Sequence, residues 1–358
     1  MRQMNKYGAW SKVAIVVAAL LQASCSMMKE DLSDCPDCRN LLRITLRYDY
    51  NTQRANMFSD HVEEVTVFVV DAATGTVVDT LTACNTAAYQ SLRDPSFGFN
   101  IEGLTPGKYR LYATGRSAAE AGFNVSVPGV GQPMSQLQFA VPTDANSDVP
   151  ALRLDTLWNT LKPASVDVSG SEPVEAVIPL MRLTNDLNVM VFRRDHPTDN
   201  GHERYEVLVT DNHPKVGYDN GPTTALQSVV YHPFASWTTA TAVSDSSTVG
   251  TIAERNAHYD FTLSRLIQHD DARQNPRLII RNKETGHEIV NIDLCYYLSL
   301  ARNAYEIQNY GIQEYLDREY DYRLDFGIEG TGEQETWKYV TIRINVLGWA
   351  IRIQNETL

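Results

Sequence analysis

The sequence predicts an all-β protein, built from β-sandwiches that follow an export signal. Short stretches that alternate apolar and polar residues recur along most of the chain. Turn signals rich in Gly, Pro, Asn and Asp separate them at intervals of roughly 8–12 residues, which is typical of sandwiches. The one long apolar run lies near the N-terminus, where a signal peptide is expected.

Segment 1–24 has the parts of a secretory signal. Its only charged residues are Arg2, Lys6 and Lys12, and its apolar run, 13–21, is nine residues long. A helix that spans a bilayer needs about 20 residues. A basic start, a short apolar run and small residues near a cleavage site instead indicate a signal peptide.

A cysteine, Cys25, directly follows the small residues Ala23 and Ser24. This order resembles the bacterial lipobox, although Gln22 stands where that pattern usually has Leu. We therefore expect Cys25 to carry a covalent acyl and diacylglycerol lipid, palmitate included. Two or more acyl chains would anchor the protein stably. Residues 25–40 would then be a lipidated tether. An ordinary signal peptide that is cut elsewhere is the alternative.

Acidic residues outnumber basic ones beyond the signal. The full chain has a net charge of −13, and removing the three basic residues of the signal leaves about −16 (−13 − 3). No stretch rich in Lys and Arg occurs, and phosphate binding needs a basic surface, so nucleic acid is not an expected partner. The 334 residues that remain (358 − 24) are enough for two domains, at about 100–200 residues each.

Four cysteines remain if Cys25 is acylated. An exported chain can pair four cysteines in three ways, and the sequence leaves the pairing open. Cys35 and Cys38 lie in the tether, without the helix start of a redox site or the second ligand pair of a zinc site. Cys84 and Cys295 lie in apolar or mixed segments, and we expect both to be buried thiols.

A first β-sandwich is expected at 41–178. Its expected strands lie at 41–50, 62–71, 76–83 and 97–115, the last of these bent by a Pro-Gly turn. Segment 117–147 is rich in Gly, Pro and Ser, and we expect it to be irregular. Segment 151–161 fits either a strand or a single helical turn.

A second β-sandwich is expected at 179–358. The strand-like stretch 173–195 joins it to the first, and its further strands are expected at 204–212, 225–234, 258–267, 276–294, 320–330 and 337–354. The clearest hairpin spans 277–294. Apolar residues with helical spacing occur only within 291–320, the one expected helical region.

The sequence lacks the common motifs of catalysis and metal binding. The sequence has no Gly-x-Ser-x-Gly elbow, no His-Glu-x-x-His and no phosphate-binding loop. Segment 143–148 lacks the Gly and the distal Glu of a calcium loop. We therefore predict no enzyme activity, no cofactor other than the lipid, no metal and no small-molecule substrate. The aromatic residues form no stacking platform that can be placed from the sequence.

Several segments resemble the Bacteroidales fimbrial anchoring lipoproteins, which are the FimB-type accessory subunits of minor and major fimbriae. The acidic Asp-Leu-Ser-Asp-Cys-Pro follows the cysteine, and Tyr-Asp-Tyr-Asn comes soon after it. The similar segments are 25–36, 42–78, 179–192, 315–326 and 344–358, so the resemblance runs nearly end to end. The Lys-Glu-Asp after Cys25 is also similar to the tag that exports Bacteroidales lipoproteins to the outer face of the outer membrane. Cys38 departs from the pattern.

This resemblance implies two tandem transthyretin-like β-sandwich domains and a structural role in cell adhesion. The protein would attach the fimbrial shaft to the outer membrane, at the cell surface. Its implied partners are a fimbrial shaft subunit, bound by β-strand addition, and the membrane, bound through the lipid. A surface lipoprotein that binds glycan or host protein, and a polymerising or tip fimbrial subunit, stay open as alternatives.

Strand addition needs an alternating strand with a free end. Segment 339–354 alternates, with an interruption at Gly348, and ends four residues before the end of the sequence. The candidate partner-binding residues are Val340, Ile342, Ile344, Trp349, Ile351 and Ile353. The alternative is that this segment is only the last strand of the second sandwich.

Overall fold

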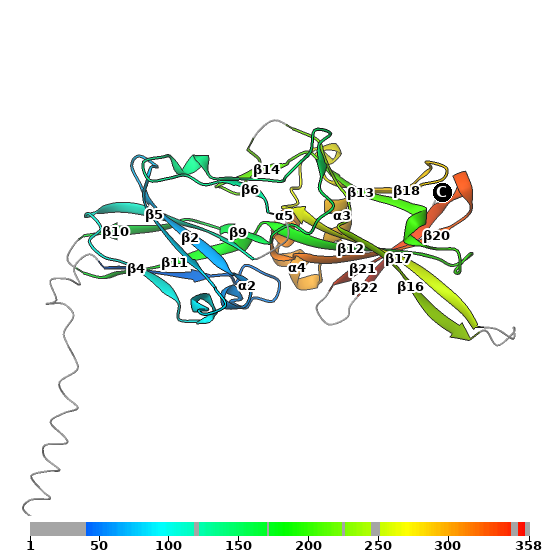
Figure 1. Ribbon diagram of the computed structural model, residues 1–358, viewed down its shortest axis with the longest axis horizontal. Helices are drawn as coiled ribbons and strands as arrows, with labels where there is room; N and C mark the ends of the chain where they lie inside the picture. The colour runs from blue at the N-terminus through cyan, green and yellow to red at the C-terminus, as the bar shows by residue number, and fades with distance from the viewer. Residues whose placement is uncertain are drawn as a thin grey trace, which may run out of the picture.

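The computed structural model describes residues 41–117, 122–169, 172–223, 226–244, 251–344 and 350–354. Strands make up most of these residues and the helices are few and short, which confirms the all-β class. The molecule is elongated, with the strands β1–β5 and β9–β11 in one half and most of the later strands in the other (Figure 1). The predicted signal 1–24 and tether 25–40, with Cys25, Cys35 and Cys38, lie outside the described residues.

An eight-stranded sheet forms the first half. Its strands follow the order β3-β2-β5-β9-β11-β1-β4, and β10 pairs with β5. Their bounds are β1 Leu42–Arg47, β2 Glu64–Asp71, β3 Val77–Cys84, β4 Gly98–Ile101, β5 Gly107–Arg116, β9 Leu157–Thr160, β10 Ala164–Val168 and β11 Val174–Arg182. Two short helical turns, α2 (Phe58–His61) and η2 (Ser91–Arg93), lie in its connections.

Alternation explains how β1 joins this sheet. Leu42, Ile44 and Leu46 are buried while Arg43 and Arg47 are exposed, because successive side chains of a strand point to opposite faces. The buried face belongs to a core that also contains Trp158 and Tyr48, whose rings meet edge to face at 5.9 Å. The sequence pattern at 41–50 therefore predicted both the strand and its inner face.

Two sheets enclose the core of the second half. One has the order β16-β17-β12-β20-β21-β22 and the other β19-β18-β13-β15-β8. Their bounds are β8 Asp148–Val149, β12 Thr184–Arg193, β13 Tyr205–Asp211, β15 Val229–Tyr231, β16 Ala235–Ser244, β17 Thr251–Ser264, β18 Arg277–Asn282, β19 Glu288–Asp293, β20 Asp321–Glu329, β21 Thr336–Ile344 and β22 Ala350–Gln354. Val189 and Phe326 of the six-stranded sheet share one hydrophobic core with Val207 and Ile280 of the five-stranded sheet.

The expected hairpin at 277–294 is confirmed. It consists of β18 and β19, which pair with Leu278 opposite Ile292. Gly286 lies in its loop with φ at +72°, a left-handed conformation that glycine adopts without steric cost.

The strand-like stretch 173–195 consists of two strands in different sheets, so it connects the two halves as expected. β11 ends at Arg182, β12 begins at Thr184, and Leu183 between them is buried. Residues 181–185 are all buried, so alternation stops where the chain passes from one core to the next. The pattern of alternation does not reveal which sheet each strand joins.

Segment 117–147 is more ordered than expected. It contains β6 (Asn124–Ser126), η3 (Met134–Gln136) and β7 (Gln138–Ala140), and β7 pairs with β14 (Lys215–Gly217) of the second half. Met134 and Phe139 pack against Phe68 and Tyr112, on the face of the eight-stranded sheet opposite its main core. β8, just beyond this segment, pairs with β15. These pairings join the two halves, and local composition does not reveal them.

The expected helical region 291–320 is confirmed. It forms α3 (Leu294–Ser299), α4 (Ala304–Asn309) and α5 (Ile312–Arg318). Asn303 and Glu306 build a capping box that satisfies backbone N–H groups at the start of α4. Among the described residues, no helix is long and apolar enough to cross a membrane.

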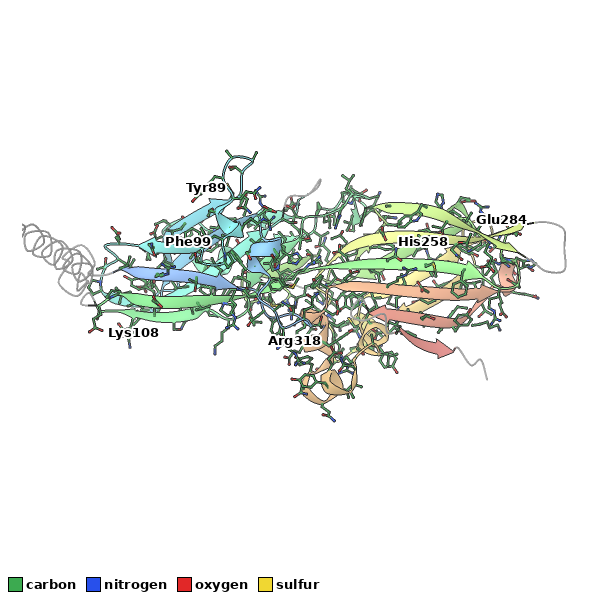
Figure 2. The ribbon with its side chains drawn as sticks, turned by 90° about the horizontal axis from the view of Figure 1, so that it is seen from below. Tyr89, Phe99, Lys108, His258, Glu284 and Arg318 are labelled. Atoms are coloured by element: carbon green, nitrogen blue, oxygen red, sulfur yellow. The ribbon has the colours of Figure 1, made fainter. Side chains whose placement is uncertain are left out.

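The end of α5 joins the two halves (Figure 2). The Arg318 guanidinium lies between two rings, with its carbon 4.0 Å from the centroid of Tyr50 and 4.5 Å from that of Tyr310. The Thr52 N–H donates to the Arg318 carbonyl at 3.2 Å, and the Thr52 hydroxyl donates to the Glu319 carboxylate at 3.0 Å. The loop after β1 is thus bonded directly to the second half.

The two described cysteines differ in burial. Cys295, in α3, is buried as expected. Cys84 is exposed, which corrects the expectation of a buried thiol. It is the last residue of β3, an edge strand in which buried and outward positions alternate, and position 84 points outward.

Candidate partner-binding edge

The candidate partner-binding segment lies at one edge of the six-stranded sheet. β21 runs between β20 and β22, and it pairs antiparallel to β20 with Phe326 opposite Val340 and Leu324 opposite Ile342. All four side chains are fully buried. Val340 and Ile342 therefore belong to the core of the second half.

The other candidates lie close by where they are described. Ile344 ends β21, while Ile351 and Ile353 lie in β22, directly opposite the buried pair of β21 in the register. Trp349 and the lipidation candidate Cys25 lie outside the described residues. The structure thus brings five of the six partner-binding candidates onto two adjacent strands.

β22 has an open edge. It pairs with β21 on one side, and no other strand of the described segments pairs with its second side. An edge strand presents a row of backbone N–H and C=O groups, which can pair with a strand of another chain. This five-residue strand therefore has the geometry that β-strand addition needs.

The described ends of the chain lie at opposite ends of the molecule. Figure 2 shows Lys108 at the end where β1 begins and Glu284 at the end toward which β22 runs. Gln354, opposite Tyr339 in the register, is the last described residue. We call the end around Glu284 the distal end.

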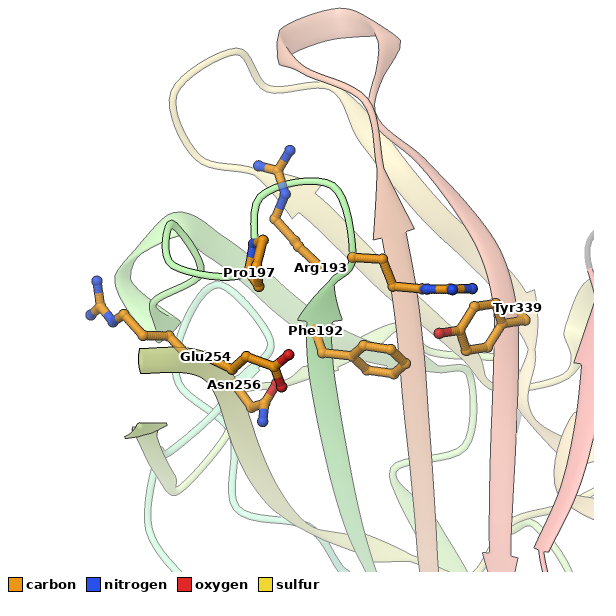
Figure 3. Close-up of a pocket in the computed structure, with 8 residues that line it drawn as sticks. Phe192, Arg193, Pro197, Glu254, Asn256 and Tyr339 are labelled. Atoms are coloured by element: carbon orange, nitrogen blue, oxygen red, sulfur yellow. The ribbon is translucent and has the colours of Figure 1, made fainter. Parts of the chain in front are cut away.

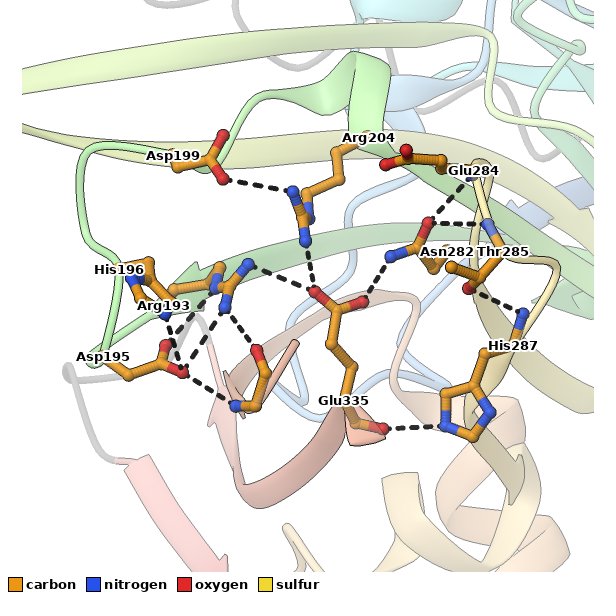
Figure 4. A network of polar contacts seen from close by, with 11 residues as sticks. Arg193, Asp195, His196, Asp199, Arg204, Asn282, Glu284, Thr285, His287 and Glu335 are labelled. Atoms are coloured by element: carbon orange, nitrogen blue, oxygen red, sulfur yellow. Dashed lines mark hydrogen bonds and ion pairs between the residues drawn. The ribbon is translucent and has the colours of Figure 1, made fainter. Parts of the chain in front are cut away.

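A buried carboxylate holds the distal end together (Figure 4). Glu335, which lies just before β21, accepts hydrogen bonds from Arg193 Nη1 at 3.1 Å, Arg204 Nη2 at 2.5 Å and Asn282 Nδ2 at 2.6 Å. The side chains of Arg193 and Glu335 are both fully buried. Because Arg193 ends β12 and Asn282 ends β18, one carboxylate connects the two sheets.

A second carboxylate fixes the turn that follows β20. Asp195 accepts the Gly330 N–H at 2.8 Å and bonds the Arg193 guanidinium, which also donates to the Gly330 carbonyl at 2.5 Å. Burial opposes the charge of Asp195, but the hydrogen bonds from Arg193 and Gly330 outweigh it and lower the pKa of this carboxyl. Asp195 and Arg193 thus bond the N–H and the carbonyl of Gly330, and these bonds fix the β20–β21 connection and the start of β21.

Sequence reasoning did not find this network. Its members are separated by up to 142 residues, so no local spacing connects them. One signal was available, since Arg193 continues the inward positions of Val189 and Val191 at the end of a strand. An arginine at a core-facing position predicts a buried acidic partner, but the pattern does not reveal which one.

The arrangement offers the geometry for binding another protein chain. Among the described residues, no group of three or more His, Cys, Asp or Glu side chains is placed to hold a metal ion. The polar network at the distal end is internal, since its charges bond one another. The open edge of β22 is the feature that another chain can use.

Comparison with known proteins gives one family. The family model described as "Fimbrillin-A associated anchor proteins Mfa1 and Mfa2" matches residues 32–355. A search of curated protein sequences gives no match.

Solved structures with the same fold come from Bacteroides and Porphyromonas species. A proposed adhesin from Bacteroides thetaiotaomicron is 24% identical with a TM-score of 0.70, over 88% of this chain and 99% of its own. A proposed polysaccharide-binding protein from the same species is 21% identical with a TM-score of 0.70, over 90% and 100%. The fimbrial anchor protein Mfa2 of Porphyromonas gingivalis is 16% identical with a TM-score of 0.61, over 88% and 99%. At these identities the likeness shows the fold.

Proposed function

This chain belongs to the family of fimbrillin-A associated anchor proteins, and on that premise we propose that it is a lipid-anchored subunit that attaches a fimbrial shaft to the outer membrane. The family consists of fimbrial proteins with structural roles, and the proposal includes no catalytic step. The observation that supports it most is the elongated fold. β1 begins at one end of the molecule, and the open-edged β22 runs toward the other (Figure 2).

The membrane contact in this proposal is a lipid on Cys25. Two or more acyl chains anchor a protein stably, whereas one chain gives only reversible binding. Residues 26–40 span at most roughly 50 Å when fully extended. The first sandwich would then stay close to the outer membrane, and the distal end would face outward at the cell surface.

The shaft contact in this proposal is β22. In one form, a strand of the shaft subunit pairs with the open edge of β22 and extends the six-stranded sheet. In the other form, β22 leaves β21 and completes the sheet of the shaft subunit. β21 stays in place in both forms, because Val340 and Ile342 are fully buried in the core. Both forms use backbone hydrogen bonds for affinity and side-chain alternation for register.

The anchor is tested by the intact mass of the protein extracted from outer membranes, beside a Cys25→Ala variant. We expect a chain that starts at Cys25 with added acyl mass. The variant should lose that mass and its membrane retention together. An unacylated chain in the membrane fraction would refute the anchor and leave the strand contact to be tested separately.

The shaft contact is tested by truncation. A chain that ends at 349 lacks β22, and one that ends at 354 keeps it and serves as the matched control. We expect the shorter chain to remain folded and membrane-bound but to lose co-purification with the shaft subunit, while the control retains it. A folded chain without β22 that still holds fimbriae would refute this contact.

A further inference from the structure

The six-stranded sheet has an outer face that the proposed function does not use. Val191 of β12 and Ala257 of β17 are opposite each other and buried in the core. Phe192, Asn256 and His258 occupy the next positions on these strands, so they lie on the outer face, because successive residues alternate between faces. This face is therefore lined by aromatic and polar side chains.

A tryptophan is stacked against a histidine on this face. Trp237 of β16 is directly opposite His258, and their rings are stacked with centroids 5.1 Å apart and planes only 8° apart. His258 is buried, at 8% exposure, while Trp237 is 38% exposed. One face of the indole is thus stacked on the imidazole, and part of Trp237 remains exposed to solvent.

His258, on which Trp237 stacks, is itself held by a hydrogen bond. His258 Nε2 and the Thr239 hydroxyl are hydrogen-bonded at 2.9 Å. Burial lowers the pKa of His258, and the Arg323 charge lowers it further. A neutral imidazole therefore stacks on the indole at neutral pH. We call Trp237 and His258 the aromatic platform, and it is formed before any ligand binds.

A pocket of about 260 Å³ opens on the same face, toward the distal end (Figure 3). Phe192 and Tyr339 form its aromatic side, with ring centroids 5.5 Å apart. Between them in the sheet is Gly327, where a Cβ atom would lie 2.6 Å from the Tyr339 ring. Glycine at 327 therefore lets the Tyr339 ring lie close to the sheet.

The other side of the pocket supplies hydrogen-bonding groups. Asn256 and Glu254 line it, and Arg194 lies at the same opening. Figure 3 shows Glu254 and Asn256 on one strand, across from Phe192. Glu254 and Arg194 are exposed and carry opposite charges. Two further arginines line the pocket, but Arg193 is paired with Glu335 and Asp195, and Arg255 with Glu203. The pocket thus offers donors and acceptors beside aromatic rings, and most of its positive charge is already paired.

We propose that this outer face binds a neutral saccharide chain, with one sugar ring on Trp237 and another in the pocket beside Phe192 and Asn256. Sugar rings have an apolar C–H face that packs on aromatic rings, while their hydroxyls bond amide and carboxylate groups. Asn256 and His258 are two residues apart along β17, about 7 Å by strand rise. Two linked sugar rings can therefore reach both places.

Other ligand classes fit this face less well. An anionic ligand needs unpaired positive charge, whereas here Arg193 and Arg255 are paired with carboxylates and Glu254 opposes Arg194. A peptide that adds as a strand needs free backbone groups, and these lie at sheet edges rather than on sheet faces. The saccharide inference is independent of the proposed contact at β22.

Native affinity electrophoresis of the full chain, extracted in detergent, tests this proposal. The gels contain mannan, galactan, xylan or dextran, which are neutral polysaccharides. We expect at least one of them to retard the protein. Trp237→Ala and Asn256→Ala should each weaken that retardation at least tenfold. Tyr89→Ala is the matched control, because Tyr89 is an aromatic residue of the other half with 71% exposure, and it should change nothing.

Thermal melting of each variant separates loss of binding from loss of folding. Trp237→Phe keeps an aromatic ring and should bind better than Trp237→Ala if the alanine variant proves unstable. Retardation by none of the four polysaccharides overturns the proposal, as does equal retardation of Trp237→Ala and the unaltered chain. Loss of shaft co-purification in Trp237→Ala, without polysaccharide binding by the unaltered chain, also overturns it and assigns this face to a protein partner.

Discussion

Removal of the Glu335 carboxylate should destabilise the second half more than any exposed ion pair does. In Glu335→Ala, Asn282 loses its acceptor, and Arg193 and Arg204 lose the charge that they share. Breaking a buried ion pair by removing one partner costs about 3–5 kcal/mol. Arg193 keeps its bonds to Asp195 and Gly330, so we expect a loss of about 3 kcal/mol, at the lower end of this range.

The loss corresponds to a clear shift in melting temperature. A cooperative unit of 150–250 residues loses roughly 2–4 °C per kcal/mol, so Glu335→Ala should melt about 6–12 °C lower. Glu335→Gln keeps an acceptor oxygen but not the charge, and its melting temperature should lie between those of Glu335→Ala and the unaltered chain. Arg273→Ala breaks the exposed pair with Asp271, where Arg273 is 89% exposed, and should melt like the unaltered chain.

Urea unfolding, followed by tryptophan fluorescence and circular dichroism, measures this change. Trp337 lies two residues from Glu335 and packs against the core, so its fluorescence reports on the same region. The reasoning is refuted if the unfolding midpoint of Glu335→Ala matches that of Arg273→Ala. The same variant should also weaken the shaft contact at β22, because Glu335 positions the start of β21, on which β22 pairs.

Three further predictions follow from buried or crowded positions. Burial raises the pKa of Asp211 from 3.8 to about 7. Between these two pH values, the carboxyl is therefore protonated in the folded chain and ionised in the unfolded chain. Stability should therefore decline as pH rises from about 4 to 7, and thermal melts at pH 5 and pH 8 should show a smaller difference in Asp211→Asn. Gly327→Ala places a Cβ atom against the Tyr339 ring, which overpacks the face at a cost of about 1–3 kcal/mol; an unchanged urea midpoint would mean that the ring moves freely. Iodoacetamide should modify Cys84 in the folded protein and reach Cys295 only after denaturation, as peptide mass mapping can check.

Local periodicity was enough to predict the fold class and most strands. The alternation of Leu42, Ile44 and Leu46 gave the strand and its inner face, since one side of that strand meets water. The helical region was found for a similar reason, because its apolar residues recur at helical spacing. Alternation stops at Leu183, because a residue between two cores is buried whichever way its side chain points.

Contacts between distant segments were beyond the sequence. The pairing of β7 with β14 joins residues about 75 positions apart, and no feature of either segment specifies the other. Trp237 and His258 are close in space only because β16 and β17 form a hairpin with that register. The aromatic platform therefore gave no signal in composition. The exposure of Cys84 was equally hidden, since it depends on which strand lies at the edge.

The direction of the terminal strands determines how the molecule bears tension. β11 and β12 run in line along the long axis, with only Leu183 between them (Figure 1). A pull on Leu42 and Gln354 from opposite ends loads β1 against β11 and β22 against β21 along their lengths. The ladder hydrogen bonds lie across this pull in the antiparallel pair β21–β22 and slant across it in the parallel pair β1–β11. In both pairs they must yield together rather than open one by one. The paired strands are thus loaded in shear at both ends of the molecule.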